Sequence, residues 1–250
     1  MDVRFLQQLG APLMTLTTMC ISYILLIDMK TNLIYATSNP GKIIEIGRHF
    51  GFHGLTVSKL SDFTDISLEP KETGTTLGEN ALIKAKAYAE VLSKLPTISG
   101  EQFIVISDDT GIFIDGLNGE PGIRVRRWKG YKMTDEEIIY HTLESMSNLS
   151  SEGRRATFRT VLCAVLVDEN GVIKNPITVE GSLEGRILEK DAPQRIIGFP
   201  FESLFFVDEY NMLLGDLHRL PDDQKHRGLF NHRERALEKI VPIIKKLIGK

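Results

Sequence analysis

Short apolar runs alternate with segments of helical periodicity along most of this chain. Residues Asn32–Ala36 form one such run, and Ile43, Ile46 and Phe50 after it share one face of a helix. Phe103–Ile106 is wholly apolar, which suits a strand that is covered on both faces. Strands and helices that alternate in this way predict an α/β fold.

The same pattern continues to the C-terminus. The residues of Asn118–Gly122 are typical of a loop, and Asn170-Gly171 predicts a hairpin turn. Asn39, Thr134 and Asn231 are placed to cap the helices that follow them. Further strands are predicted at residues 55–57, 156–168, 172–173, 177–181, 186–188 and 204–207, and further helices at 76–95, 134–146 and 235–248.

Composition limits the class of protein. A chain of 250 residues with 42% hydrophobic residues predicts one domain with a proper core. Its net charge of −3 argues against a nucleic-acid scaffold. Cys20 and Cys163 have neither metal-ligand spacing nor the pattern of a disulfide framework, which favours a reducing cytosol.

The N-terminus differs from the rest. No charged residue lies between Arg4 and Asp28, and Leu13–Ile27 is largely apolar, as in a signal peptide or an anchor helix. Met29, directly before the first predicted strand, offers another start. We therefore expect residues 1–28 to be an extension outside the native fold and residues 29–250 to form a single domain. A membrane anchor is the alternative.

Two adjacent carboxylates, Asp108 and Asp109, follow the apolar run in a segment, Ser107–Gly111, that predicts a turn. Neighbouring carboxylates at the end of a buried strand repel each other, so they need a cation or a shared proton. Magnesium prefers carboxylate oxygen and accompanies phosphate. A magnesium site and an ordinary acidic turn fit these residues equally well.

Polar residues at two helix starts suggest a phosphate site. A strand that leads into a helix at Thr37–Lys42 predicts anion binding by free amides, the helix dipole and Lys42, although a solvated lysine is the simpler alternative. Asn80 and Lys84 share one face of the next helix. Such a stripe usually faces solvent, but it begins beside Glu72 and precedes the acidic segment, which favours a common cleft.

Two later segments carry candidate base-binding residues. Phe199 and Phe201 precede a strand, a position typical of core residues and also of rings that stack on a base. His232 and Arg233 lie in the predicted first turn of the last helix, where cations are unfavourable for the dipole. A polar ligand would account for their position.

These segments contain a series of short motifs in one order. The motifs are T-x-N-x-x-K at 37–42, E-T-G at 72–74, E-N-A at 79–81, K-A at 84–85, D-D-T-G at 108–111, G-x-P-G at 119–122, G-F at 198–199, F-F at 205–206 and H-R at 232–233. Together they resemble the inosine/xanthosine triphosphate pyrophosphatase family, from about Asn32 to the C-terminus. The departures from its pattern are Pro200, Glu202-Ser203, Asn231 and Arg227. They lie in the segments that would bind the base, whereas the segments that would bind the triphosphate follow the pattern.

The resemblance implies an α/β fold with a long twisted mixed sheet flanked by helices, and two lobes around a central nucleotide cleft. It implies Mg²⁺-dependent hydrolysis of ITP, dITP and XTP between the α- and β-phosphates, giving nucleoside monophosphate and pyrophosphate. It also implies a cytoplasmic homodimer that binds a purine nucleoside triphosphate, with no nucleic acid polymer and no membrane as partner.

The resemblance further assigns roles. Lys42 and Lys84 would hold the triphosphate, and Asp109 would orient or deprotonate the attacking water. Phe199 and Phe201 would sandwich the base, and His232 and Arg233 would read its edge. The predicted metal ligands are Glu72, Asp108 and Asp109. The predicted substrate-binding residues are Thr37, Ser38, Asn39, Pro40, Gly41, Lys42, Asn80, Lys84, Thr110, Phe199, Pro200, Phe201, Glu202, Arg227, His232 and Arg233.

Two other functions are compatible with the sequence. One is a related pyrophosphatase for other modified nucleotides, pyrimidines included, because the base loop departs from the family's pattern. The other is a nucleotide-binding regulator that does not hydrolyse its ligand. The acidic pair Asp108-Asp109 argues against a regulator, because binding alone does not require it.

Overall fold

The computed structural model describes residues 31–95, 101–221, 224 and 228–249. The predicted extension at residues 1–28 lies outside these residues, and its relation to the fold stays a prediction. The described part is an α/β unit built on an eight-stranded sheet, which confirms the predicted fold class. None of its helices is long and apolar enough to cross a lipid bilayer.

The sheet has the strand order β2-β1-β3-β5-β6-β7-β8, with β4 paired to β3 beside this path. It is mixed, because β1 and β2 pair in parallel, whereas the pairs β3–β5, β5–β6, β6–β7 and β7–β8 are antiparallel. The strands are β1 (Thr31–Tyr35), β2 (Val57–Ser58), β3 (Gln102–Ile114), β4 (Pro121–Gly122), β5 (Arg155–Val167), β6 (Ile177–Ile187), β7 (Phe205–Val207) and β8 (Met212–Leu213).

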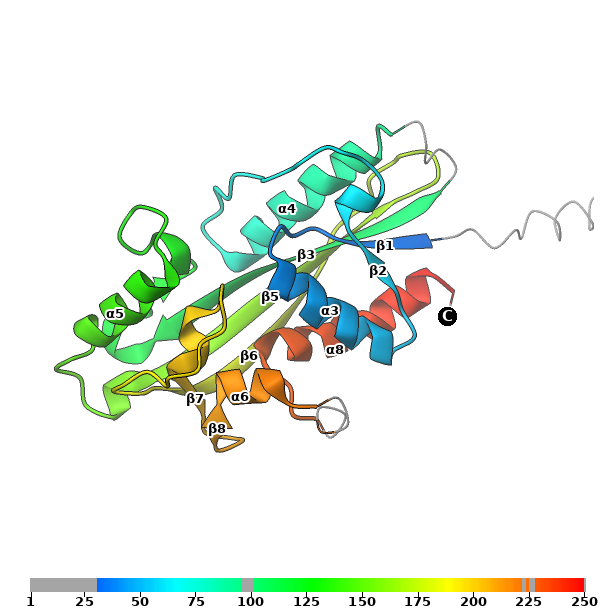
Figure 1. Ribbon diagram of the computed structural model, residues 1–250. Coiled ribbons are helices and arrows are strands. Elements are labelled where there is room, and N and C mark those ends of the chain that lie inside the picture. The colour runs from blue at the N-terminus through cyan, green and yellow to red at the C-terminus, as the bar shows by residue number, and fades with distance from the viewer. Residues whose placement is uncertain (1–30, 96–100, 222–223, 225–227, 250) are drawn as a thin grey trace, which may run out of the picture. The chain divides into compact units, whose positions relative to one another are not determined.

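Helices cover both faces of the sheet. Helices α3 and α8 pack on one face, and α4 packs against β3 and β5 on the other (Figure 1). Helix α5 lies near the far end of β3 and β5 (Figure 1). The helices are α3 (Pro40–Phe52), α4 (Leu77–Leu92), α5 (Asp135–Ser145), α6 (Leu214–Arg219) and α8 (His232–Leu247).

Side-chain caps set where the main helices begin. The Asn39 side chain accepts hydrogen bonds from the first turn of α3, as does Asn231 for α8. Thr76 and Thr134 form capping boxes with Glu79 and Glu137. Each cap satisfies amides that have no partner within the helix, and the caps predicted at Asn39, Thr134 and Asn231 are confirmed.

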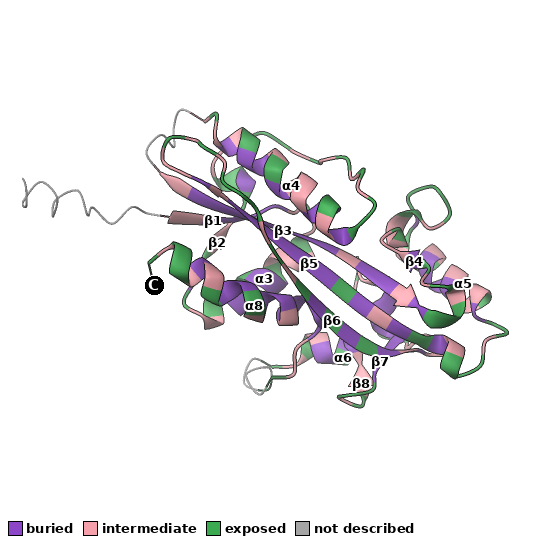
Figure 2. Cartoon of the chain, turned by 180° about the vertical axis from the view of Figure 1, so that it is seen from behind, coloured by how far each residue is buried: buried purple, intermediate pink, exposed green. Residues whose placement is uncertain are grey.

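The buried residues of β3 alternate between the two faces. Ile104 and Ile106 pack in the cluster with α3 and α8, whereas Phe103 and Val105 pack in the cluster with α4. Figure 2 shows β3 as an almost continuously buried strand, as is β5 from Thr160 onward. A strand buried on both faces carries apolar residues at successive positions, as the sequence of Phe103–Ile106 indicated.

Three sequence-based boundaries are wrong. The predicted turn at Ser107–Gly111 is part of β3, which pairs with β5 without interruption from Phe103 to Ile114. The predicted strands at 177–181 and 186–188 are one strand, β6. Val172–Ile173 forms only an isolated bridge, between Ile173 and Val167. In the first two cases the segment pairs with β5 along its whole length. This pairing gives its backbone N–H and C=O groups hydrogen-bond partners, so the strand continues where a turn was expected.

Candidate active site

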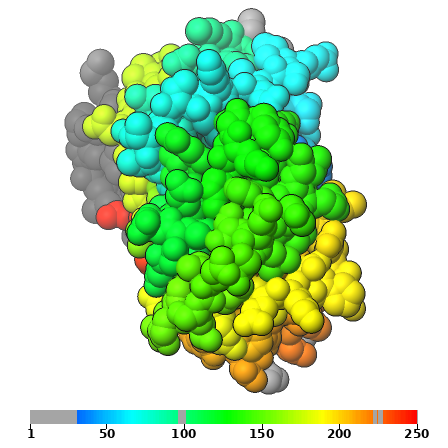
Figure 3. All heavy atoms as spheres, turned by 90° about the vertical axis from the view of Figure 1, so that its left-hand side faces the viewer, coloured from blue at the N-terminus to red at the C-terminus, as the bar shows by residue number. Residues whose placement is uncertain are grey.

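A cleft of about 1020 Å³ lies at the edge of β3, just beyond the end of β1. Strand β1 bonds β3 as far as the bond from Ala36 N–H to the Ile106 carbonyl, and β4 pairs with β3 only from Ile112. The edge of β3 between these points carries Asp109 and Thr110 into the cleft. In Figure 3 the green segment around residues 125–150 lies between cyan atoms of earlier residues and yellow atoms of later ones. Parts of all three regions line the cleft.

Asp108 and Asp109 point to opposite faces of the sheet because they are successive residues of a strand. Asp108 contacts residues of α3 and α8, and Asp109 contacts residues of α4. Asp109 lines the cleft, whereas Asp108 lies beneath it with 1% of its surface exposed. The two carboxylates therefore do not form one acidic pair.

Asp108 is held by two cations. Lys42 Nζ lies 2.8 Å from its Oδ2, and Arg233 Nε donates to the same oxygen at 3.3 Å. The Tyr35 and Thr110 hydroxyls also donate to this carboxylate. Burial alone would raise the pKa of Asp108, but Lys42 and Arg233 hold it well below its usual value. The contacts around Asp108 thus favour its ionised form and fix it in place.

A second buried anion supports the same arginine. Arg233 Nη1 donates to Glu45 Oε2 at 2.5 Å, and Asn231 Nδ2 donates to Glu45 Oε1 at 2.7 Å. Burial alone would raise the pKa of Glu45, but Arg233, together with smaller contributions that include the hydrogen bond from Asn231, lowers it to about 2. Glu45 therefore fixes the start of α8 against α3, with both charges of the pair buried.

Asp109 has a different environment. Asn80 Nδ2 donates to its Oδ2 at 3.1 Å, and Lys84 Nζ lies 3.3 Å from its Oδ1. The same ammonium lies 2.7 Å from Glu72 Oε1, so Lys84 bridges two carboxylates at the wall of the cleft. Burial raises the pKa of Asp109, and Glu72 adds to the rise, although Lys84 opposes it. A raised pKa suits a carboxylate that accepts a proton during reaction.

The start of α3 forms another wall of the cleft. Thr37, Ser38, Asn39 and Lys42 line the cleft there, and Pro40 is the first residue of the helix. Asn39 Oδ1 accepts hydrogen bonds from the Gly41 and Lys42 amides, at 2.9 and 3.4 Å. The helix dipole and Lys42 would favour an anion at this helix start, and anion binding here stays a prediction.

Positive charge gathers in the cleft although the whole chain has a net charge of −3. Eight of its lining residues are Lys or Arg and four are Asp or Glu. A cleft with this excess attracts a polyanion. The basic lining residues are Lys42, Lys71, Lys84, Arg124, Arg126, Arg127, Lys132 and Arg233.

The loop that begins at Gly198 is fixed on α5. Arg126 Nη2 donates to the Gly198 carbonyl at 2.8 Å, and the Gly198 amide donates to Asp135 Oδ2 at 2.7 Å. Arg126 also pairs with Asp135 at 2.5 Å. These bonds place Phe199 beside the start of α3, where a Cβ on Gly41 would come within 2.6 Å of the Phe199 ring. Only glycine allows so close an approach.

Phe199 and Phe201 differ in burial. Phe199 is half-buried, lines the cleft and lies 5.5 Å from the His218 ring. Phe201 is 3% exposed and belongs to the core beside α5, where its ring meets Phe158 edge-on at 5.9 Å. The structure thus brings one of the two predicted stacking rings to the cleft as a half-exposed surface, and stacking on a base stays a prediction for both.

His232 is buried and its tautomer follows from a chain of hydrogen bonds. Asp108 can only accept, so the Thr110 hydroxyl donates to it and accepts from the Thr160 hydroxyl at 2.8 Å. The Thr160 oxygen must then accept from His232 Nδ1–H at 2.6 Å. Nε2 of the neutral ring is left as an acceptor. Burial, with Arg233 adding to it, lowers the pKa of His232 to about 3.

Arg233 and Glu202 also line the cleft. Arg233 has five N–H groups, and Asp108, Glu45 and Thr110 accept three of them. Glu202 Oε1 pairs with His218 Nδ1 at 3.0 Å, while its Oε2 is buried without a hydrogen-bond partner among the described residues. Burial raises the pKa of Glu202. The cleft therefore offers both donors and acceptors to a ligand.

Most residues predicted from the sequence converge here. The predicted Arg227 lies outside the described residues, and Pro200 lines the cleft although most of its surface is buried. Sequence reasoning did not assign Tyr35, Glu45, Phe158, Thr160 or Arg126 to the site. These five make their site contacts with residues far away in the sequence. No local pattern therefore marks them.

Comparison with known proteins gives a consistent result. The model of the Ham1 family matches residues 33–243. The chain is 35% identical over 213 residues to a dITP/XTP pyrophosphatase of Bacillus cereus, covering 85% of this chain and 94% of that protein. It is 34% identical over 221 residues to the dITP/XTP pyrophosphatase of Bacillus subtilis, covering 88% and 99% of the two chains.

Solved structures agree with the sequence comparisons. The Ham1 protein of Staphylococcus aureus aligns with a TM-score of 0.65 at 27% identity, over 87% of this chain and 99% of that one. A HAM1 protein from Coxiella burnetii gives a TM-score of 0.66 at 25% identity, over 87% of this chain and all of that one. The likeness covers the part of the chain that forms the sheet and the cleft.

Proposed function

The chain belongs to the Ham1 family, and from that premise we propose that it hydrolyses ITP, dITP and XTP to nucleoside monophosphate and pyrophosphate. One observation supports this best. On one wall of the cleft the Lys84 ammonium lies between Glu72 and Asp109, and the N-terminus of α3 with Lys42 forms another wall. A triphosphate and its counter-cation need this combination of anion-binding helix start, cations and acidic ligands.

The donor set fits Mg²⁺. Glu72 and Asp109 supply hard carboxylate oxygens on the cleft side, and an ammonium already occupies the position between them. The rise in the pKa of Asp109 that burial and Glu72 cause shows that more positive charge would stabilise the ionised carboxylates. When bound, Mg²⁺ would neutralise charge on the phosphate oxygens. We propose Glu72 and Asp109 as its ligands.

The sequence also predicted Asp108 as a metal ligand, but it fits that role less well than Glu72 and Asp109. Its two oxygens already accept from Lys42, Arg233, Tyr35 and Thr110. We propose instead that Asp108 orients Lys42 toward the triphosphate and Arg233 toward the base.

The chain's own residues account for the chemical step as follows. Lys42 and Lys84 hold the phosphates in line, where positioning and charge supply most of the catalysis of phosphoryl transfer. Asp109, whose side chain faces the cleft, orients the attacking water and accepts its proton. Asn80 donates to Asp109 Oδ2 and so keeps the carboxylate facing the cleft.

The residues that would surround the base support selection of 6-oxo purines. Hypoxanthine and xanthine present an acceptor at O6 and a donor at N1, whereas adenine presents the reverse. Arg233 retains N–H donors, and His232 Nε2 and Glu202 Oε2 are acceptors. Adenine would leave these groups unpaired, and a site built around hydrogen bonds rejects such a ligand strongly. Phe199 would stack on the base.

A panel of nucleoside triphosphates tests this function. We expect Mg²⁺-dependent release of pyrophosphate from ITP, dITP and XTP, well above release from ATP and GTP. The assay should separate pyrophosphate from orthophosphate at the first turnover. Orthophosphate as the first product would place the cleavage at the β–γ bond and contradict the proposal.

Two further parts of the proposal rest on the family resemblance. We propose that the protein acts as a homodimer and that it works in the cytoplasm, which the sparse cysteines favour. Size measurement in solution would test the first part.

A further inference from the structure

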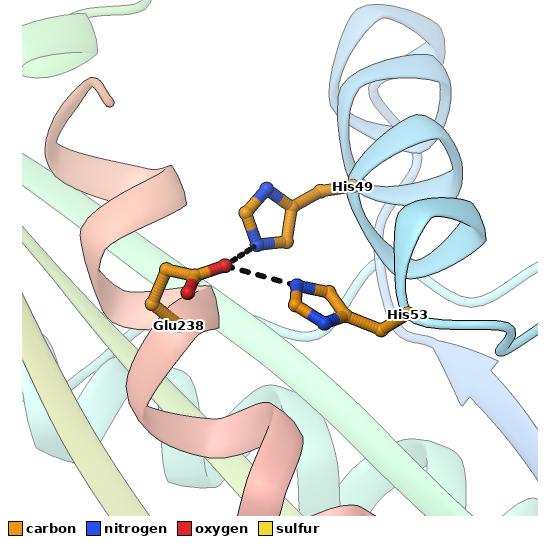
Figure 4. A group of neighbouring side chains, drawn as sticks. All are labelled: His49, His53 and Glu238. Atoms are coloured by element: carbon orange, nitrogen blue, oxygen red, sulfur yellow. Dashed lines mark hydrogen bonds and ion pairs between the residues drawn. The ribbon is translucent and has the colours of Figure 1, made fainter. Parts of the chain in front are cut away.

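A second cluster of metal-ligating side chains lies between α3 and α8, outside the residues that line the cleft. His49 lies in the last turn of α3, and His53, four residues later, is the residue that follows the end of the helix, so both rings project toward Glu238 of α8 (Figure 4). Nε2 of each ring lies 2.9 Å from Glu238 Oε1. One ligand atom from each of the three residues lies within 4.8 Å of the other two.

The buried histidine lacks ordinary partners. His49 is 2% exposed, and among the described residues neither of its ring nitrogens makes a hydrogen bond. Its Nε2 approaches the Glu238 carboxylate closely but not with the geometry of a hydrogen bond. A buried polar atom that is aimed at a carboxylate and left unsatisfied requires an explanation, and a shared cation provides one.

We propose that His49, His53 and Glu238 bind a divalent transition-metal ion, of which Zn²⁺ fits best, and that this ion links α3 to α8. Two imidazoles and one carboxylate are a common ligand set for Zn²⁺, with water in the fourth position. At tetrahedral angles such ligand atoms are about 3.3 Å apart. The observed 2.9 Å separations need only small side-chain shifts to admit the ion.

The surroundings suit binding and exchange of the ion. The His53 and Glu238 side chains are 27% and 38% exposed, so the ion reaches the site from solvent. Mg²⁺ prefers oxygen ligands and would not compete here.

The position of the site connects it to the cleft. His49 lies one turn after Glu45 on α3, and Glu45 pairs with Arg233 at the start of α8. An ion on His49, His53 and Glu238 would hold the same two helices together a short distance further along. Bound metal should therefore stabilise the fold around the cleft without touching the substrate.

Metal titration of the full-length, untagged chain tests the proposal. Co²⁺ serves as the coloured probe and Zn²⁺ as its competitor, with millimolar Mg²⁺ present throughout. We expect saturable binding of one Co²⁺ per chain, with the strong visible absorption of a tetrahedral nitrogen–oxygen site that Zn²⁺ abolishes. Against this constant background of Mg²⁺, Zn²⁺ should also raise the melting temperature.

Three variants make the test specific. His53→Gln and Glu238→Gln should each weaken Zn²⁺ binding by about tenfold or more, at least the cost of losing an outer-shell partner. Both residues are partly exposed, so both variants should fold. His141→Gln on α5 is the matched control and should bind like the wild type. No saturable binding, or equal binding by the wild type and both ligand variants, would overturn the proposal. Neither outcome depends on nucleotide hydrolysis.

Discussion

The two faces of β3 at residues 108 and 109 show how one strand separates structure from chemistry. Asp108 faces α3 and α8, where two cations and two hydroxyls saturate it. Asp109 faces α4 and the cleft, where its partners are one amide and the Lys84 ammonium that Glu72 shares. The pKa of Asp108 is lowered and that of Asp109 is raised. Identical side chains at adjacent positions thus have opposite shifts in pKa, which agrees with the anchor and the proton acceptor that we propose.

The phenylalanines of the 198–203 loop repeat this division. Phe201 packs with Phe158 in the core, while Phe199 remains half-buried at the cleft. Two similar residues in one motif therefore need not share a role. Because Phe199 is the more exposed of the two, we expect it rather than Phe201 to contact the substrate.

The largest effect should come from Asp109→Asn. The amide keeps the shape of the side chain but cannot accept a proton, so turnover of ITP should fall by about 10²–10⁴-fold, as for other positioned general bases. The melting temperature should stay within a few degrees of the wild type. Steady-state kinetics and a thermal melt measure both. Turnover like that of the wild type would assign the base elsewhere, most directly to Glu72.

Asp108→Asn should mainly affect stability. It leaves the Lys42 and Arg233 charges buried without one of their anions, which typically costs roughly 3–5 kcal/mol of the free energy of unfolding. Urea unfolding at neutral pH measures the loss. A variant as stable as the wild type would show that Asp108 is no anchor.

Substituting Phe199 and Phe201 in turn should separate an effect on binding from an effect on stability. Phe201→Ala should lower the free energy of unfolding by roughly 3–5 kcal/mol, as for other buried aromatic residues. Phe199→Ala should instead weaken nucleotide binding by roughly 1–3 kcal/mol, the usual value for a ring stacked on a base. Paired measurements of melting temperature and KM separate the two effects. The reverse assignment would place Phe201, not Phe199, against the base.

The stability of the protein should also fall in acid because of His232, which lies on the same side of β3 as Asp108. Its pKa falls to about 3 on folding, so the unfolded chain binds a proton between that value and the ordinary one near 6.5, and the folded chain does not. Stability is therefore lost as pH falls through this window. Between pH 7 and pH 5 the loss should be about 2 kcal/mol for this residue. Urea unfolding of His232→Gln should show a loss smaller by that amount, whereas His141→Gln should behave like the wild type.

Local chemistry in the sequence accounts for much of the fold. The caps Asn39, Thr134 and Asn231 mark the starts of α3, α5 and α8 because capping depends on residues only a few positions apart. The apolar run Phe103–Ile106 marks the buried part of β3 for the same reason. Features that are complete within one element were predictable.

Features that depend on contacts between different elements could not be predicted from the sequence. Asp and Gly at Ser107–Gly111 favour a turn, but pairing with β5 and cations on both faces keep this segment extended. The sequence could not show that Asp108 and Asp109 have separate partners, because Arg233 and Lys84 come from different helices. The Glu45–Arg233 pair and the approach of Glu238 to His49 likewise join positions that only the folded chain brings together.

The Mg²⁺ concentration for half-maximal ITP hydrolysis tests the division of roles on β3 most directly. The wild type, Asp108→Asn, Asp109→Asn and Glu72→Gln should be compared under one set of conditions. If Glu72 and Asp109 hold the ion, that concentration should rise about tenfold or more in Asp109→Asn and Glu72→Gln and change little in Asp108→Asn. A rise confined to Asp108→Asn would contradict the account, because it would place the metal on the buried face of the strand.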